Sequence, residues 1–171
     1  MARAFIGIGS NIEPAENVRA AIRSLAQKTR LACISTVYLT EALGRPDQPP
    51  YHNCVVEIET DLPPAVLKFG LLRSIENSLG RQRTADKYAP RTIDLDLIVY
   101  GDLTLDVDGI KLPDPEILDR PFLAIPLSEL APGMVLPSYG LRIGEIAARL
   151  PQDGMRPLPD YTKSLREELL A

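Results

Sequence analysis

The segment 90–100, Pro-Arg-Thr-Ile-Asp-Leu-Asp-Leu-Ile-Val-Tyr, constrains the fold of this chain more than any other stretch. Its density of Ile, Leu, Val and Tyr predicts a β-strand, in which alternate side chains share a face. One face carries Asp94 and Asp96, about 6.6 Å apart along the backbone. The other is predicted to be apolar and buried, formed by Ile93, Leu95, Leu97 and Val99. The strand therefore needs a core behind it and presents two carboxylates to a hard cation in front.

Length and composition predict one globular domain in a reducing cytoplasm. The 171 residues are 45% apolar and 25% charged, which suffices for a proper core. A net charge of -4 gives no basic field for nucleic acid, and no apolar run reaches the roughly 18 residues of a membrane span. Residues 1–9 are too short and Gly-broken for a signal peptide. Cys33 and Cys54 are expected to be buried thiols, and the protein is expected to be a monomer or weak homo-oligomer.

Apolar periodicity predicts the element order β-α-β-β-α-β. This order matches a ferredoxin-like α+β fold, an antiparallel sheet with helices on one face, whose other face is left to loops. Strands are predicted at 4–8, 31–40, 52–60 and around the aspartates, and helices at 14–28 and 62–80. The second helix is predicted to bury a stripe formed by Val66, Phe69, Leu72, Ile75 and Leu79.

Further elements are predicted after this repeat. A small hairpin turns at Asp108-Gly109, because Gly and Asp accept the backbone angles of tight turns. Helical segments are predicted at 123–130 and 141–150, a linker at 151–159 and a terminal helix at 161–170. A single domain is therefore expected over residues 1–150, followed by a C-terminal extension over 151–171.

The cationic loop before the aspartates favours phosphate chemistry. Arg81, Arg83 and Arg91 flank the carboxylate pair, arginine forks match phosphate oxygens, and Mg²⁺ prefers one or two carboxylates plus phosphates. Glycoside cleavage fits less well, because its carboxylates usually converge from different elements. On this pattern alone two other interpretations remain open: a surface ion network of the aspartates with Arg91 and Arg83, and a small metal-dependent hydrolase.

A longer set of motifs narrows these alternatives. Gly80-Arg81-Gln82-Arg83, followed by Pro90-Arg91-Thr92-Ile93-Asp94-Leu95-Asp96, resembles the signature of the 6-hydroxymethyl-7,8-dihydropterin pyrophosphokinase family of the folate pathway. Four further motifs follow the order and spacing of that family: Ile8-Gly9-Ser10-Asn11, Tyr38-Leu39-Thr40, Tyr51-His52-Asn53 and Arg120-Pro121-Phe122. The resemblance covers roughly residues 4–150 and implies that residues 1–150 form a single catalytic domain.

The resemblance implies transfer of pyrophosphate from ATP to the hydroxymethyl oxygen of a reduced pterin, with release of AMP. It implies that Asp94 and Asp96 bind two Mg²⁺ ions and that Arg81 and Arg91 hold phosphates. The positions it implies for ATP are Glu76, Arg83, Tyr88, Leu97, Lys111, Asp114 and Arg120. Those it implies for the pterin are Tyr51 and Phe122 on the ring faces, Asn53 at the amide edge, and main chain near Thr40 and Leu43. The loops 41–51 and 81–90 would be mobile lids.

Three positions depart from the family pattern. Asp114 stands where the family usually has a histidine, Tyr88 replaces a tryptophan, and Lys111 could substitute for a cation that some members carry near Gly109. An anion beside ATP phosphates opposes their binding. The alternative is therefore a non-catalytic pterin- or nucleotide-binding relative with a weakened ATP site. His52, the single histidine, lies between two family positions and is predicted to be exposed or structural.

Overall fold

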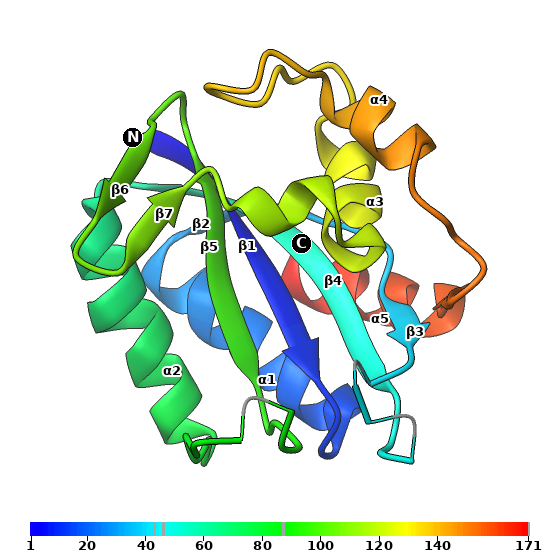
Figure 1. Ribbon diagram of the computed structural model, residues 1–171. Helices are drawn as coiled ribbons and strands as arrows, with labels where there is room; N and C mark the ends of the chain where they lie inside the picture. Colours follow the sequence, from blue (N-terminus) through cyan, green and yellow to red (C-terminus); the bar gives the residue numbers. More distant parts are fainter. Residues whose placement is uncertain (43, 46, 87, 171) are drawn as a thin grey trace.

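The computed structural model describes residues 1–42, 44–45, 47–86 and 88–170, so Leu43 lies outside the described residues (Figure 1). Its centre is a six-stranded antiparallel sheet in the order β5-β1-β4-β3-β8, with β2 also paired to β4. The strands are β1 (Ala2–Ser10), β2 (Arg30–Ile34), β3 (Tyr38–Thr40), β4 (Tyr51–Thr60), β5 (Asp94–Tyr100) and β8 (Met155–Pro157). The predicted antiparallel α+β fold is confirmed.

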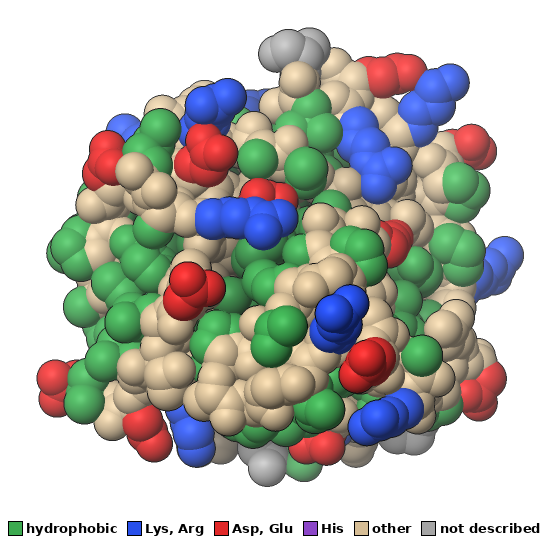
Figure 2. All heavy atoms as spheres, turned by 90° about the horizontal axis from the view of Figure 1, so that it is seen from above, with side chains coloured by type: hydrophobic (Ala, Val, Ile, Leu, Met, Phe, Trp, Pro, Cys, Tyr) green, Lys and Arg blue, Asp and Glu red, His purple; other side chains and the backbone are tan. Residues whose placement is uncertain are grey.

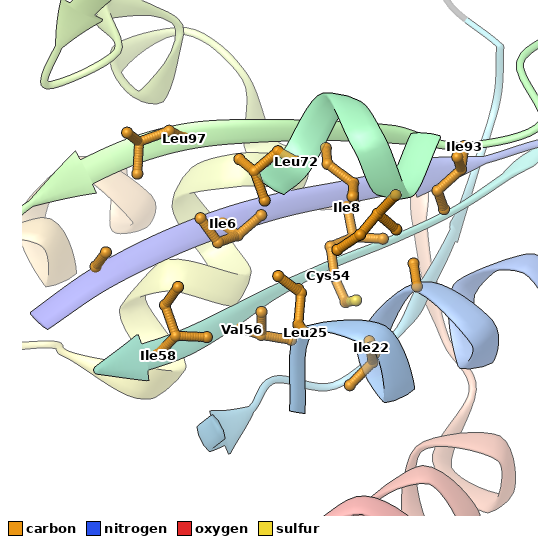
Figure 3. Close-up of a cluster of buried hydrophobic side chains, with 14 of the residues drawn as sticks. Ile6, Ile8, Ile22, Leu25, Cys54, Val56, Ile58, Leu72, Ile93 and Leu97 are labelled. Atoms are coloured by element: carbon orange, nitrogen blue, oxygen red, sulfur yellow. The ribbon is translucent and has the colours of Figure 1, made fainter. Parts of the chain in front are cut away.

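One face of the sheet is covered by α1 (Pro14–Lys28), the π-helix η1 (Val66–Leu72), α2 (Arg73–Ser78) and α5 (Pro159–Leu169). Figure 3 shows Leu25 of α1 and Leu72 of η1 facing the strands across this core. The two helices of the repeat thus share one face, as predicted. The expectation that loops alone line the opposite face was wrong. Its apolar side chains, such as Phe5 and Val55, are covered by α3 (Pro121–Leu130) and α4 (Ile143–Ala148).

Two strands deviate from regular pairing. The predicted strand 31–40 is divided into β2 and β3, because three residues lie between Ile34 and Tyr38 whereas only two lie between their partners Val56 and Asn53 on β4. In β5 the register shifts opposite Phe5 and Ile6. Val99 therefore packs with Phe5 rather than with Leu97, and its predicted face was wrong. A bulge inserts one residue and reverses the facing of the side chains beyond it.

The second helix begins as a π-helix, which changes the residues that it buries. Val66 is 50% exposed and Phe69 38% exposed, whereas Leu67 is fully buried. The predicted stripe was wrong at Val66 and Phe69, because the wider i to i+5 turn alters which positions face the core. Leu72 and Ile75 are buried as predicted, in the second half of the element.

The last segments of the chain join the same structure. The predicted hairpin is confirmed as β6 (Leu105–Val107) and β7 (Ile110–Leu112), with positive φ at Asp108 and Gly109. The linker prediction was wrong over residues 155–157, which pair with β3 as β8. A boundary at residue 150 stays a prediction. On the face drawn in Figure 2, acidic and basic side chains are interspersed, and none of the helices in the described ranges has the length and apolar character to cross a bilayer.

Candidate active site

A cavity of about 440 Å³ opens where β1, β3, β4 and β5 meet the start of α3. It brings together residues from both predicted groups, which are separated by up to 82 positions in the sequence. Those for ATP and metal are Arg81, Arg83, Tyr88, Arg91, Asp94, Asp96 and Arg120, and those for the pterin are Thr40, Tyr51, Asn53 and Phe122. A second cavity of about 170 Å³ adjoins it at Asp94 and Asp96 and adds Glu76.

Asp94 is held between two arginines. Nη1 of Arg81 donates to one carboxylate oxygen at 2.5 Å, and Nη1 of Arg91 donates to the other at 2.8 Å. Arg81 also donates to Glu76 at 2.7 Å. Burial alone would lower the pKa of the Arg81 guanidinium, but the charges of Asp94 and Glu76 outweigh it and raise that pKa. Arg81 is therefore fixed as a cation between two carboxylates.

Glu76 organises this network from the core. Its side chain is only 3% exposed, and it accepts hydrogen bonds from Arg81, from Arg83 at 2.5 Å and from the backbone N–H of Leu95 at 2.9 Å. The bond to Leu95 ties α2 to β5 directly beside Asp94. A buried carboxylate is tolerated here because each of its oxygens has a charged partner.

Asp96 lies in a different environment, two residues further along the same strand. It remains exposed, and within the described part of the chain it makes no ion pair. Although its side chain reaches solvent, surrounding protein atoms reduce the hydration of its carboxyl. This effect, followed by the negative charges of Asp94, Asp114 and Glu76, raises the pKa of Asp96 well above its ordinary value. The ionised form of Asp96 therefore has no cationic partner among the described residues.

This donor set fits Mg²⁺. The described residues contain no group of three or more His, Cys, Asp or Glu side chains placed to hold a metal, so the protein offers the carboxylates of Asp94 and Asp96. One or two carboxylates are the number that Mg²⁺ commonly takes from a protein, since water and substrate phosphates complete its shell. A cation here would also offset the repulsion that raises the pKa of Asp96.

The opposite wall of the cavity is neutral and built on strand pairing. Asn53 of β4 donates from its amide to the hydroxyl of Thr40 on β3 at 2.6 Å, and both side chains are buried. Gly7 and Gly9 of β1 form the floor. A Cβ at Gly9 would lie 2.6 Å from the amide oxygen of Asn53, and one at Gly7 would lie 2.9 Å from a methyl of Leu123. A side chain at Gly9 would therefore collide with Asn53, whereas one at Gly7 would require only the end of the Leu123 side chain to shift.

Asn11 joins the loops around the cavity. Its side-chain oxygen accepts from the backbone N–H of Arg91 at 2.8 Å, and its amide donates to Gln48 and to the carbonyl of Pro49 at 3.2 Å. Gln48 in turn donates to the carbonyl of Tyr88 at 2.7 Å. The predicted lids 41–51 and 81–90 therefore contact each other in this structure. Their mobility stays a prediction.

Several predicted site residues lie elsewhere. The side chain of Leu97 is buried in the core and Lys111 is exposed on β7, and neither lines a cavity. Asp114 lines neither cavity and accepts from the backbone N–H of Glu116 at 2.9 Å, which caps the short 3₁₀ helix Pro115–Leu118. Burial raises the pKa of Asp114, against the opposing effects of that hydrogen bond and of Lys68 and Lys111. The Leu43 prediction cannot be compared with the described residues.

Sequence reasoning missed the glycine floor, Gln48 and Leu123, and the cations Lys68 and Arg73 of the second cavity. The Gly-x-Gly-Ser-Asn run at the end of β1 was a usable signal, because two glycines in a central strand indicate close approach of another group. His52 lines neither cavity and its ring lies 5.6 Å from that of Tyr161, which agrees with the predicted structural role.

Comparison with known proteins identifies relatives over most of the chain. The sequence model of the 7,8-dihydro-6-hydroxymethylpterin-pyrophosphokinase (HPPK) family matches residues 5–132. A Pseudomonas aeruginosa protein named 2-amino-4-hydroxy-6-hydroxymethyldihydropteridine pyrophosphokinase is 36% identical over 160 residues, or 92% of this chain and 97% of that protein. A protein of the same name from Haemophilus influenzae is 38% identical over 141 residues, or 81% of this chain and 87% of that protein.

A solved structure supports the same fold. The crystal structure of a Plasmodium falciparum HPPK-DHPS triple mutant matches 98% of this chain with a TM-score of 0.68 at 10% sequence identity. This chain spans 44% of that longer chain. At so low an identity the likeness extends to the fold alone.

Proposed function

Because this chain belongs to the 7,8-dihydro-6-hydroxymethylpterin-pyrophosphokinase family, we propose that it transfers pyrophosphate from ATP to the hydroxymethyl group of 6-hydroxymethyl-7,8-dihydropterin, releasing AMP, in folate biosynthesis. The observation that carries this proposal is the meeting of two unlike walls in one cavity: Asp94, Arg81 and Arg91 on one side, Tyr51 and Asn53 on the other. A charged wall suits polyphosphate, and an amide beside an aromatic ring suits a flat heterocycle.

On the phosphate side, Asp94 and Asp96 would hold two Mg²⁺ ions, which would neutralise phosphate charge and lower the pKa of the attacking hydroxyl. Arg81 and Arg91 bind the phosphates of ATP, exchanging Asp94 for phosphate oxygens. Glu76 keeps Arg81 and Arg83 oriented toward the cavity, because both guanidinium groups donate to its buried carboxylate. Arg120 and Tyr88 line the same cavity and complete the nucleotide side.

On the pterin side, Tyr51 and Phe122 stack on the ring. Asn53 recognises the amide edge of the pterin, since its amide offers both a donor and an acceptor. Its bond to Thr40 selects one orientation of that amide. The glycine floor admits the flat ring beside β1.

Catalysis by these residues is mainly positioning. Pyrophosphoryl transfer places little covalent chemistry on the protein, so rate comes from alignment and charge stabilisation. The loops 41–51 and 81–90 close over both substrates and exclude water. A cytoplasmic location, action as a monomer or weak homo-oligomer, and the lack of a nucleic-acid partner belong to the same proposal and rest on composition and a net charge of -4.

The test is an assay for AMP release with ATP, Mg²⁺ and the hydroxymethyl pterin. We expect AMP only when all three are present. Folded protein that releases no pterin-dependent AMP would refute the proposal. Magnesium-dependent phosphate release without pterin would instead indicate a hydrolase. A purely binding relative is not favoured, because the similar curated proteins are named as pyrophosphokinases.

A further inference from the structure

Residues 155–166, called here the C-terminal segment, lie directly behind the neutral wall of the cavity. Strand β8 pairs with β3 along its whole length, with Met155 opposite Thr40 and Pro157 opposite Tyr38. On its other edge β3 pairs with β4, with Thr40 opposite Tyr51 and Tyr38 opposite Asn53. Figure 1 shows β3 between β4 and the beginning of α5. Strand β3, which has three residues, is therefore paired on both edges, with β4 on one and with β8 on the other.

Thr162 fixes the backbone where β3 begins. Its hydroxyl accepts from the backbone N–H of Val37 at 2.9 Å and donates to the carbonyl of Leu158 at 2.8 Å. The N–H of Leu158 donates to the carbonyl of Val37, also at 2.9 Å. The N–H and the carbonyl of Val37 are therefore both hydrogen-bonded, the first to Thr162 of α5 and the second to Leu158, the residue before that helix. Val37 is fully buried and Thr162 is 2% exposed, so water cannot replace these bonds.

The segment is also anchored at the far end. Nε of Arg166 donates to the carbonyl of Ile34, the last residue of β2. On the other side of α5, Tyr161 donates to the carbonyl of Ala15, and Glu168 accepts from Arg19 and Arg23 of α1. The break between β2 and β3 is therefore held from two sides. Strand β4 bonds Ser35, whose N–H donates to the carbonyl of Val55 at 2.9 Å, and the C-terminal segment bonds Val37.

We propose that the C-terminal segment positions the pterin-binding wall and that Thr162 is a positioning residue for the reaction. This inference rests on the proposed function. The hydrogen bonds of Thr162 set the place of Val37, which immediately precedes β3, and β3 ends at Thr40. Thr40 then sets the orientation of the Asn53 amide at 2.6 Å. Thr162 touches no cavity and acts through this chain of contacts alone.

The test compares two hydroxyl deletions in one helix. Thr162→Val keeps the side-chain shape and removes the buried acceptor for Val37. Ser164→Ala removes a hydroxyl that accepts only an exposed bond from Arg19 at 3.0 Å. Calorimetry measures binding of the hydroxymethyl pterin and, separately, of a non-hydrolysable ATP analogue. We expect Thr162→Val to raise the pterin Kd about fivefold, a change of roughly 1 kcal/mol, with less than a twofold change for the ATP analogue.

Two further measurements separate positioning from general stability. Thr162→Ser should restore pterin affinity to within about twofold of wild type, and hydrogen exchange over residues 37–40 should be faster in Thr162→Val alone. Arg166→Met, which loosens the other end of the same segment, serves if Thr162→Val folds poorly. A lower melting temperature with an unchanged pterin Kd would overturn the inference. Wild-type protein that binds no pterin would refute the proposed function, and the inference with it.

Discussion

The two walls of the cavity are held in place by different physical means. The wall proposed to bind phosphate, formed by Arg81, Arg91 and Asp94 and called here the phosphate wall, depends on side-chain ion pairs between elements, with Arg81 bridging Glu76 and Asp94. The pterin wall depends on strand register, with Thr40 and Asn53 joined by one short neutral bond. Ion pairs can exchange partners when a charged substrate arrives, whereas strand pairing cannot shift by less than a residue. The wall proposed for ATP can therefore adapt to its ligand, whereas the wall proposed for the pterin is preset.

The largest effect should come from the metal position on the charged wall. Asp96→Ala should lower pterin-dependent AMP release by about 10³-fold or more, because it removes one of the two carboxylates proposed to hold Mg²⁺. The fold should survive, since Leu95 and Leu97 on either side remain buried. Circular dichroism checks the fold, and Asp106→Ala on the exposed hairpin is the control. A nearly normal rate would show that the metal assignment is wrong.

Glu76→Gln tests the buried ion pairs that support that wall. Removing the charge leaves Arg81 and Arg83 without their shared partner, and breaking a buried pair costs about 3 kcal/mol of unfolding free energy. The control is Asp86→Asn, which breaks an exposed pair with Arg45 and should cost less than about 1 kcal/mol. Urea unfolding measures both. Equal losses in the two variants would contradict the distinction between buried and exposed pairs.

Gly9→Ala tests the neutral wall. The added methyl would lie 2.6 Å from the amide oxygen of Asn53, so that amide must move and the pterin KM should rise about tenfold or more. Gly7→Ala is the matched control, because its methyl would meet only the movable end of Leu123. The KM for ATP should change little in either variant. A Gly9→Ala enzyme with normal pterin KM would refute the assigned floor.

Asp114→Asn tests a negative charge that acts on Asp96 from outside the two cavities. Asparagine can still accept from the N–H of Glu116, so the 3₁₀ helix keeps its cap. Loss of a negative charge near Asp96 should lower the KM for ATP about twofold to fivefold. The exposed Asp119→Asn serves as control. If ATP affinity instead falls in Asp114→Asn, the carboxylate contributes to nucleotide binding.

The smallest effect concerns the pH dependence of the unliganded protein. The pKa of Asp96 is raised in the folded state, so its cost to folding grows as the pH rises above the unfolded pKa and is complete above the folded pKa. Below the unfolded pKa, near about 4, this penalty is absent. Asp96→Asn should therefore raise the melting temperature at pH 7 in chelator, and the gain should vanish toward pH 4. Asp94→Asn should lower the melting temperature at pH 7, because Arg81 and Arg91 lose their shared carboxylate partner.

The sequence predicted those parts of the molecule that depend on local pattern. Helix α1 was predicted at its observed bounds, because an uninterrupted amphipathic run and flanking polar residues define it. The π-turn at Val66–Leu72 and the shift beside Val99 could not be predicted, since both are set by packing across the sheet. Strand β8 was missed because three residues with a proline carry no periodic signal.

In the candidate site, the residues of the sequence motifs could be predicted, but the residues that hold them in place could not. Arg81, Arg91 and Asp94 lie close together in the sequence, so their grouping follows from one strand and its preceding loop. The role of Glu76 as a shared acceptor depends on α2 packing beside β5, which no pattern in the sequence specifies. Asn11 meets Arg91 from 80 positions away. Such contacts follow from topology rather than from residue spacing.

The glycine floor has a consequence for inhibition of this enzyme. At Gly9 every substitution adds atoms beside Asn53, in the space proposed for the pterin. Under that proposal, a change that excludes an inhibitor bound against this strand also excludes the substrate. The backbone atoms themselves cannot be altered by mutation. A compound that binds mainly through the main chain of β1 would therefore allow few resistance substitutions. A compound that relies on Tyr88 or Arg83 could lose its affinity through a single substitution of an exposed side chain.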